Sequence, residues 1–394
     1  MTSATVYHEI KPEILSWLVN QIDSDKMKEE TLQRINDWQN GSKKPTFHQI
    51  LDLSKETKVP LGYFFLNTPP IEDYSFMEYR TIESQKFKTP SRDLIDVIHN
   101  MENIQDWMRE YLIQSDESPL NFVGSQKNNK NVLEIAKLIR SELNLETEWF
   151  EKSKRAEDSF KTIREAAQKT GILVMKSGVV KGNNHRPLDV EEFRAFTMID
   201  DYAPLIFINT KDSVNAQLFS LLHEIAHIWY GNNSIFNKPI HSKNEKTINK
   251  DEMYCNAIAN EILVPNEIFA AKWNSYNTEN KDKILALSKY FKCSTTVIAR
   301  NALDYGYIEK KLYEKIADDA ASKHLETQKQ KKGGGPRRVD TIALYYDRRF
   351  LMSLAASVYE GKTLFTDAFK LTNTRHKTFI KLMDKISGRG QRNG

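Results

Sequence analysis

The chain has 394 residues, of which 40% are hydrophobic and 10% aromatic, and its formal net charge is +4. A chain of this length normally folds into two or three domains, and this composition excludes a wholly disordered protein. No apolar run reaches the roughly 18 residues of a membrane-spanning helix and no basic-then-apolar leader is visible, so we expect a cytoplasmic protein without membrane association. The two cysteines, Cys255 and Cys293, form no CxxC motif, which argues against a disulfide framework and a thiolate zinc site.

Charge is distributed unevenly along the chain. From Lys323 onward, sixteen Lys and Arg stand against six Asp and Glu, and residues 1–322 therefore carry a net charge of minus six. An excess of positive charge attracts polyanions such as nucleic acid, so we expect any such partner to bind near the C-terminal end.

The N-terminal segment, residues 1–70, is predicted to be a bundle of short helices. Apolar residues in PEILSWLVNQI and in TLQRINDW recur at the spacing of one helix face. QNGSKKPT follows both stretches and contains a Gly that ends a helix and a Pro that precedes the next helical stretch, FHQILDLSKETKVPLGYFFL. Residues 71–170 follow, and charged amphipathic patterns such as VLEIAKLIRSELNL predict a helical linker or packing region.

The central segment, residues 171–310, is predicted to combine a small sheet with helices. The runs GILVMKSGV, FRAFTMID and PLIFINT are short, rich in β-branched or aromatic residues, and bounded by Gly, Pro and Asp, as strands are. A helix is expected to begin at the N-cap candidates Asp212 and Ser213 and to end at Gly231. Two more helices are expected over KDEMYCNAIANEILVP and NEIFAAKWNSY.

Two further segments complete the chain. Residues 311–338 are predicted to be a basic flexible linker, because the stretch ETQKQKKGGGPRRVD at residues 326–340 is polar, basic and partly Gly-rich. Residues 339–394 recover apolar spacing and are predicted to form a small basic helical tail domain. The predicted fold class is therefore α+β and mostly helical, with the sheet confined to the central domain.

The central helix contains the sequence HEIAH, in which His223 and His227 lie four residues apart. Residues at that spacing lie above one another on a helix, so both imidazoles can bind one tetrahedral ion. Glu224 lies beside the pair, where a carboxylate can take a proton from metal-bound water. The alternative is that three polar residues fell on one helix by chance. The apolar residues around the motif predict a buried helix, however, and polar side chains there need a compensating partner, which favours a metal site.

A catalytic zinc site normally has three protein ligands and one open position, so a third ligand is required. The downstream segment DEMYCNAIANEILVP offers Asp251, Glu252 and Glu261. Glu252 is preferred because Asn256 lies one turn later on the same face and can support a ligand by hydrogen bonding. Asp251 and His241 remain alternatives.

Hydrolysis at such a site also needs a donor that stabilises the oxyanion. Tyr230, His241 and Tyr254 are candidates only by their proximity in the sequence, so the donor is not assigned.

The segment EEFRAFTMIDDYAPLIFINTKDSVNAQLFSLLHEIAHIWYG, followed by EMYCNAIANEILVP, resembles the ImmA/IrrE family of metallo-endopeptidases. The resemblance extends to about Ile308. It implies a small zincin-like fold in which His223, His227 and Glu252 are metal ligands and Glu224 is the base.

The same resemblance implies a substrate class. The substrate would be a DNA-binding repressor or an antitoxin-like regulator, and the ion zinc, although manganese also accepts two imidazoles and a carboxylate. Ser220 occupies a position where the family commonly carries Thr, a change that leaves the residues of the metal site intact.

The N-terminal INDWQNGSKKPTFHQILDLSKETKVPLGYFFLNTPP looks like the second half of an Xre-type helix-turn-helix domain, which precedes such a peptidase in many bacterial and phage proteins. The chain between Trp17 and Trp38 is short for the usual helix, turn and recognition helix, and its segment QIDSDKMKEE is acidic. Residues 1–50 contain six Lys and Arg against seven Asp and Glu. Because duplex DNA is bound largely through its phosphates, a partner-docking or structural role is favoured over DNA binding here.

Two functions therefore compete. The first is a metal-dependent endopeptidase in which Glu224 activates metal-bound water to cleave a regulatory protein. The second is an antitoxin-like or transcription-regulatory protein with a structural metal site and a toxin or DNA partner. Glu224 favours the first function, because a structural site needs no base beside its ligands. Binding of nucleic acid by the basic tail is a third and weaker hypothesis.

Overall fold

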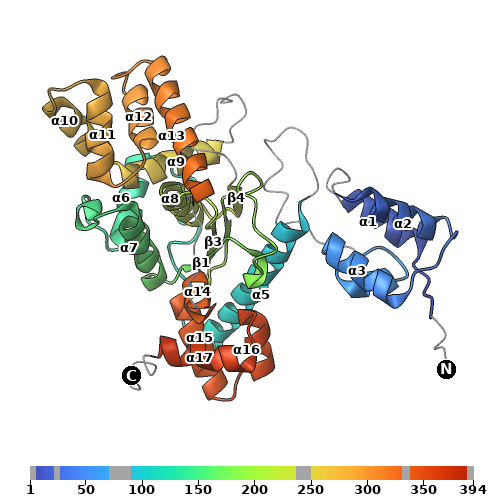
Figure 1. Ribbon diagram of the computed structural model, residues 1–394. Coiled ribbons are helices and arrows are strands. Elements are labelled where there is room, and N and C mark those ends of the chain that lie inside the picture. The colour runs from blue at the N-terminus through green and yellow to red at the C-terminus, as the bar shows by residue number, and fades with distance from the viewer. Residues whose placement is uncertain (1–5, 22–26, 71–89, 237–249, 331–337, 388–394) are drawn as a thin grey trace. The chain divides into compact units, whose positions relative to one another are not determined.

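The computed structural model describes residues 6–21, 27–70, 90–236, 250–330 and 338–387 (Figure 1). The chain divides into two compact units, one of residues 1–76 and 85–96 and the other of residues 77–84 and 97–394. None of the helices in the described ranges is long and apolar enough to cross a membrane. The fold is mostly helical with one small sheet, which confirms the predicted class.

The first unit contains a bundle of short helices, as predicted. These are α1 (Pro12–Gln21), α2 (Glu29–Gln39), α3 (Phe47–Thr57) and the 3₁₀ helix η2 (Leu61–Phe65). Thr46 and Gln49 form a capping box that satisfies the free backbone N–H groups at the start of α3. The core of this unit is built from the buried residues Ile10, Ile14, Leu15, Leu18, Ile35, Trp38, Ile50, Leu53, Val59 and Phe64. Whether this segment binds DNA stays a prediction.

A four-stranded mixed sheet lies at the centre of the second unit. Its strands are β1 (Leu173–Ser177), β2 (Ala195–Met198), β3 (Leu205–Asn209) and β4 (Ser234–Phe236), in the order β1-β3-β2-β4. β1 is parallel to β3, whereas β2 is antiparallel to both β3 and β4. The three strands predicted between residues 171 and 210 are confirmed, and β4 is an addition that the sequence pattern did not reveal.

The motif helix α8 (Val214–Tyr230) packs on this sheet and is buried along nearly its whole length. Ser213 caps it by accepting a hydrogen bond from the N–H of Ala216, and Gly231 ends it with a left-handed φ of 73°. Both ends lie where the sequence predicted them. α7 (Ala156–Lys169) and α9 (Lys250–Leu263) also pack against α8, so the polar motif lies in the interior of the unit.

The remaining helices flank this core. Before the sheet come α5 (Arg92–Gln114), whose first turn belongs to the first unit, and α6 (Val132–Glu142). After α9 come α10 (Asn266–Ser275), α11 (Asn280–Phe291), α12 (Thr295–Asp304) and α13 (Lys310–Gln330).

The prediction of a flexible linker over residues 311–338 is wrong for the part up to Gln330, because α13 occupies that stretch. The buried Tyr313 and Ile316 anchor the start of α13. The sequence that follows is rich in Ala, Glu, Lys and Leu, which are good helix formers.

The C-terminal tail is helical, as predicted, and consists of α14 (Arg338–Tyr345), α15 (Arg348–Tyr359), α16 (Phe365–Thr372) and α17 (His376–Ile386). It is linked to β1 by two polar side chains. Asp347 accepts a 3.0 Å hydrogen bond from the N–H of Val174, and Arg164 donates to the carbonyl of Val174 and to that of Tyr346. These contacts provide hydrogen-bond partners for the N–H and the carbonyl of Val174 on the outer edge of β1, as a neighbouring strand would.

Candidate metal centre

The two histidines of the motif converge on one point. His223 and His227 are 0% and 2% exposed, and their Nε2 atoms lie 3.0 Å apart. Successive turns of α8 bring the imidazoles together, and the packing of the helix in the core removes them from bulk solvent.

Glu252 on α9 completes a triangle with these imidazoles. Its Oε2 lies 3.3 Å from Nε2 of His223, and its Oε1 lies 3.2 Å from Nε2 of His227. Ligand atoms bound to a tetrahedral zinc ion at about 2.0 to 2.1 Å lie about 3.3 to 3.4 Å from one another. The three side chains therefore lie close enough together to hold one divalent ion, and their donor set of two imidazoles and a carboxylate suits zinc or manganese.

The electrostatics of Glu252 agree with this role. Burial alone would raise the pKa of its carboxyl group, but His227 and His223 beside it hold that pKa well below its usual value. The side chain keeps 31% of its surface exposed, so solvent reaches the triangle on the side of Glu252. Metal binding requires an ionised carboxylate together with neutral imidazoles.

Glu224 occupies a different environment from the three residues of the triangle, although it follows His223 directly. It is 0% exposed, and its Oε2 accepts hydrogen bonds from Oγ1 of Thr197 at 2.6 Å and from Oγ of Ser234 at 2.5 Å. Its Oε1 is buried and has no hydrogen-bond partner among the described residues. Burial raises the pKa of Glu224, an effect that the nearby imidazoles and the two hydroxyls oppose.

The two hydroxyls that hold Glu224 come from directly opposed positions in the sheet. Thr197 of β2 and Ser234 of β4 are partners in the antiparallel register, so both side chains stand on the same face of the sheet, beneath α8. One carboxylate oxygen is thus fixed by two donors, whereas the other has no donor within the described ranges.

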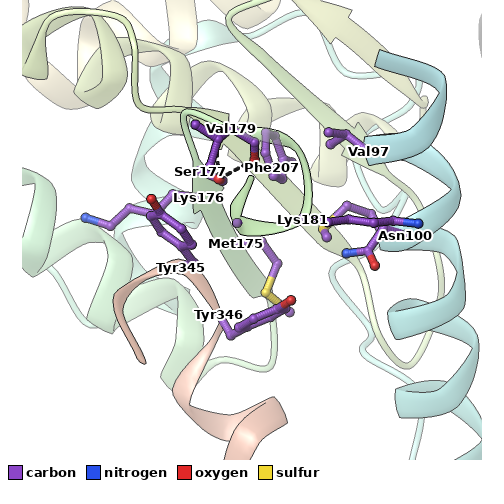
Figure 2. A pocket seen from close by; sticks show the side chains of 12 residues that line it. Val97, Asn100, Met175, Lys176, Ser177, Val179, Lys181, Phe207, Tyr345 and Tyr346 are labelled. Atoms are coloured by element: carbon purple, nitrogen blue, oxygen red, sulfur yellow. Dashed lines mark hydrogen bonds between the residues drawn. The ribbon is translucent and has the colours of Figure 1, made fainter. Parts of the chain in front are cut away.

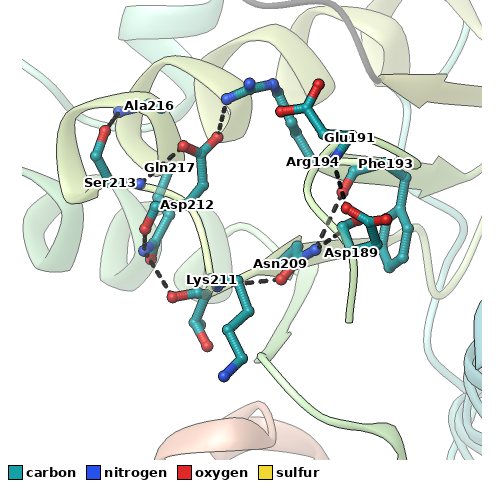
Figure 3. Close-up of polar contacts among 11 residues, drawn as sticks. Asp189, Glu191, Phe193, Arg194, Asn209, Lys211, Asp212, Ser213, Ala216 and Gln217 are labelled. Carbon is teal, nitrogen blue, oxygen red and sulfur yellow. Dashed lines mark hydrogen bonds and ion pairs between the residues drawn. The ribbon is translucent and has the colours of Figure 1, made fainter. Parts of the chain in front are cut away.

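A polar network fixes the start of α8 relative to the sheet, as Figure 3 shows. Arg194, just before β2, forms an ion pair with Asp212, just before the helix. At the end of β3, Asn209 donates to the carbonyl of Phe193 at 3.1 Å and accepts from the N–H of Lys211 at 3.1 Å. These bonds connect both strands to the first turn of the motif helix.

The other end of α8 is fixed by a close backbone approach. The N–H of Gly124 donates to the carbonyl of Ile228 at 2.9 Å, and that of Gln126 donates to the carbonyl of Trp229 at 2.8 Å. A Cβ on Gly231 would lie 2.8 Å from Cα of Gly124, so only glycine allows this contact.

The other residues that the sequence suggested lie outside the triangle. Asp251 accepts a 3.1 Å hydrogen bond from Asn232, and Asn256 makes no side-chain hydrogen bond to any described residue. Glu261 is buried and accepts from the N–H of Asn266. His241 lies outside the described residues.

The contacts of Tyr230 and Tyr254 do not identify either hydroxyl as an oxyanion donor. The hydroxyl of Tyr230 donates to the carbonyl of Asn129 at 2.9 Å, and the ring of Tyr230 stacks on that of Tyr254 at a centroid distance of 6.5 Å. The hydroxyl of Tyr230 is therefore already engaged with a backbone carbonyl.

Sequence reasoning missed Thr197 and Ser234. The run FRAFTMID predicted a strand, but nothing in it distinguished Thr197 from other strand residues. Ser234 belongs to a three-residue strand whose pattern is too short to detect, and its contact with Glu224 depends on the register between β2 and β4.

Comparison with known families yields two matches. Residues 167–303 match a family model described as the IrrE N-terminal-like domain, of the peptidase family M78. Residues 346–385 match a domain of unknown function, DUF8813. No curated protein and no solved structure matches the chain. The first match covers the sheet, the motif helix and α9 to α11 with nearly all of α12.

Proposed function

Residues 167–303 belong to the ImmA/IrrE family of metallopeptidases, and from that premise we propose that the chain is a metal-dependent endopeptidase that cleaves a regulatory protein. One observation carries the proposal: His223, His227 and Glu252 present three donor atoms within 4.8 Å of one another, with mutual distances that suit one tetrahedral ion.

We assign His223, His227 and Glu252 as the ligands. When bound, a divalent ion such as zinc supplies Lewis acidity, which polarises a peptide carbonyl and makes a water molecule more acidic. Structural zinc sites are closed by four protein ligands, whereas the described residues bring three together. The smaller number favours a catalytic site over the structural site that a purely regulatory protein would need.

Glu224 is assigned as the general base. Thr197 and Ser234 hold its Oε2, which keeps the side chain in one rotamer. Oε1 has no donor among the described residues and is the atom that accepts the proton of the attacking water. Burial raises the pKa of Glu224, which favours uptake of that proton and its later transfer to the leaving amine.

The proposed substrate class rests on the resemblance to this family. We propose that the substrate is a DNA-binding repressor or an antitoxin-like regulator, whose cleavage releases its target. The partial exposure of Glu252 supports access for a polypeptide, because the triangle opens to solvent on that side.

The test is cleavage of candidate repressors by the purified chain with added zinc. We expect one or a few discrete cuts that a chelator abolishes. Glu224→Gln should lower the rate by about 10² to 10⁴ while metal stays bound, since general-base catalysis typically contributes that much. Glu261→Gln is the matched control, because it alters another buried glutamate outside the triangle. Cleavage by Glu224→Gln at the wild-type rate would refute the mechanism.

A further inference from the structure

The C-terminal helices α16 and α17 are joined by a tight turn of particular form. α16 has eight residues and ends at Thr372, Asn373 follows in the left-handed region with φ 49° and ψ 41°, and α17 begins at His376. Two helices joined by three or four residues, with a left-handed residue after the first helix, have the backbone pattern of a helix-turn-helix. Asparagine tolerates this conformation better than most residues with a side chain.

The burial pattern of these helices agrees with that arrangement. One continuous inner face runs through both helices and the turn, and its buried members are Ala368, Thr372, Thr374, Phe379 and Leu382. α15 packs against both helices and supplies a third side to this core. α14 also packs against α17, and together these helices bury one face of α17 and leave the opposite face to solvent.

The turn is anchored by hydrogen bonds. The side-chain amide of Asn373 donates to Oδ1 of Asn100 at 3.1 Å and to the hydroxyl of Tyr346 at 3.2 Å. Figure 2 shows Asn100, on α5, and Tyr346, just after α14, where they line one pocket. These bonds tie the turn between α16 and α17 to α5 and to the residue that follows α14.

The outward face of α17 carries more basic than acidic side chains, its acid being the exposed Asp384. Arg375, Lys377 and Lys381 are exposed, and none of them has an acidic partner among the described residues. Ile380 and His376 lie exposed between them. Because these three cations form no ion pairs within the described chain, they are available to phosphate groups.

A second pair of helices in the chain shows why exposure matters. α11 and α12 are also joined through a left-handed residue, Lys292, with φ 55°. However, α12 packs against α11 and α13, and its buried residues are Thr296, Val297, Ile298, Ala299, Asn301 and Ala302. The turn geometry alone therefore does not create a binding surface, whereas α17 combines that geometry with an exposed positive face.

We propose that α16 and α17 form a DNA-binding helix-turn-helix, in which α17 enters the major groove of double-stranded DNA through Arg375, Lys377 and Lys381. This activity is separate from peptide hydrolysis, because it uses a different part of the chain and no residue of the metal centre. It gives the peptidase a means of acting where a DNA-bound regulator is found.

The test measures the affinity of the full-length Glu224→Gln chain for a labelled duplex of about 30 base pairs at salt concentrations between about 50 and 200 mM. In the test variant, Arg375→Gln, Lys377→Gln and Lys381→Gln are combined. In the control variant, Lys310→Gln, Lys311→Gln and Lys315→Gln remove the same charge from the exposed side of α13.

We expect the parent chain to bind with an affinity that falls steeply with salt. The test variant should bind at least about tenfold more weakly at the lowest salt. Its slope of log affinity against log salt should be shallower by up to about 2.7, or about 0.9 for each phosphate that it no longer neutralises. The control variant should bind within about twofold of the parent.

Three results would overturn the proposal. The first is no binding of duplex DNA by the parent chain even at low salt. The second is equal affinity and slope for the test variant and the parent, which would assign any binding to the basic residues outside α17. The third is equal competition by single-stranded DNA of the same length, since a helix that reads the major groove requires a duplex.

Discussion

Ser234, on a strand that follows the motif helix, donates a 2.5 Å hydrogen bond to Oε2 of Glu224 on that helix. The partner of Ser234 in the sheet is Thr197, which donates to the same oxygen at 2.6 Å. The sheet thus acts on the proposed base directly, because it fixes the carboxylate through side chains of two different strands.

Removal of either hydroxyl should weaken catalysis without removing the metal. Ser234→Ala frees the carboxylate to adopt other rotamers, and we expect kcat/KM to fall by about tenfold, as for a lost hydrogen bond to a charged group. Ser234→Thr keeps the hydroxyl and should restore most of the activity. Equal rates for Ser234→Ala and the wild-type chain, measured on the same substrate, would show that the hydrogen bond has no positioning role.

The sequence predicted the parts of the site that depend on local spacing. His223 and His227 meet because a helix repeats every 3.6 residues, and that repeat is visible in HEIAH. Glu252 lies 25 residues after His227, yet the choice was narrow because few carboxylates follow the motif in a helical pattern. The distances at these three residues agree with the predicted ligand set, although their role as ligands stays a proposal.

Other features could not be read from spacing. Thr197 and Ser234 meet Glu224 only because β4 pairs with β2 in one register, and a three-residue strand leaves no periodic pattern. The docking of the tail on β1 depends on Asp347, which lies 173 positions after its hydrogen-bond partner Val174. The helix over residues 311–330 was missed because a polar, basic composition fits a linker and an exposed helix equally well.

The close approach of Gly231 and Gly124 predicts unequal effects of two matched substitutions. Gly231→Ala places a Cβ 2.8 Å from Cα of Gly124 and forces a left-handed alanine, so we expect a loss of about 2 to 4 kcal/mol in stability. Gly124→Ala meets Cα of Gly231 only at 3.7 Å, so it carries the backbone strain of about 1 to 2 kcal/mol without the clash. Thermal unfolding of both variants measures the difference, and a lower Tm for Gly124→Ala than for Gly231→Ala would contradict this account.

Removal of the buried carboxylate of Asp347 should weaken the packing of the C-terminal tail on β1. Asp347→Ala leaves the N–H groups of Val174 and Phe350 without their acceptor and leaves Arg164 without its nearby charge, which should cost about 3 kcal/mol or more. We expect faster hydrogen exchange in α14 to α17 and little change in α8. Asp384→Ala, which alters an exposed acid of α17, is the control. Unchanged exchange in the tail of Asp347→Ala would mean that other contacts hold it in place.

Lys176 predicts a pH dependence of stability. Burial, together with the charge of Arg164, lowers the pKa of Lys176 to about 8, and its ammonium lies 5.1 Å from the ring centre of Phe160. The ammonium of Lys176 keeps its proton up to a higher pH in the unfolded chain than in the folded chain. The free-energy cost of burying this charge is therefore fully present below about pH 8 and is relieved as the pH rises through the folded pKa.

Lys176→Met removes this cost at every pH. The variant should therefore exceed the wild-type chain in Tm most clearly near pH 7, and the difference should shrink as the pH is raised from about 8 to about 10. Thermal unfolding across that range tests the prediction. A difference in Tm that does not change with pH would show that the titration of Lys176 is not coupled to folding.

The central claim is that His223, His227 and Glu252 bind one catalytic metal ion, and metal stoichiometry tests it most directly. We would measure zinc and manganese bound to the purified wild-type chain, to Glu252→Ala, and to the neighbouring Asp251→Ala as a control. The account predicts one ion per chain in the wild type and in Asp251→Ala, and a large loss in Glu252→Ala. Retention of the ion by Glu252→Ala, or no tightly bound ion in the wild-type chain, would contradict it.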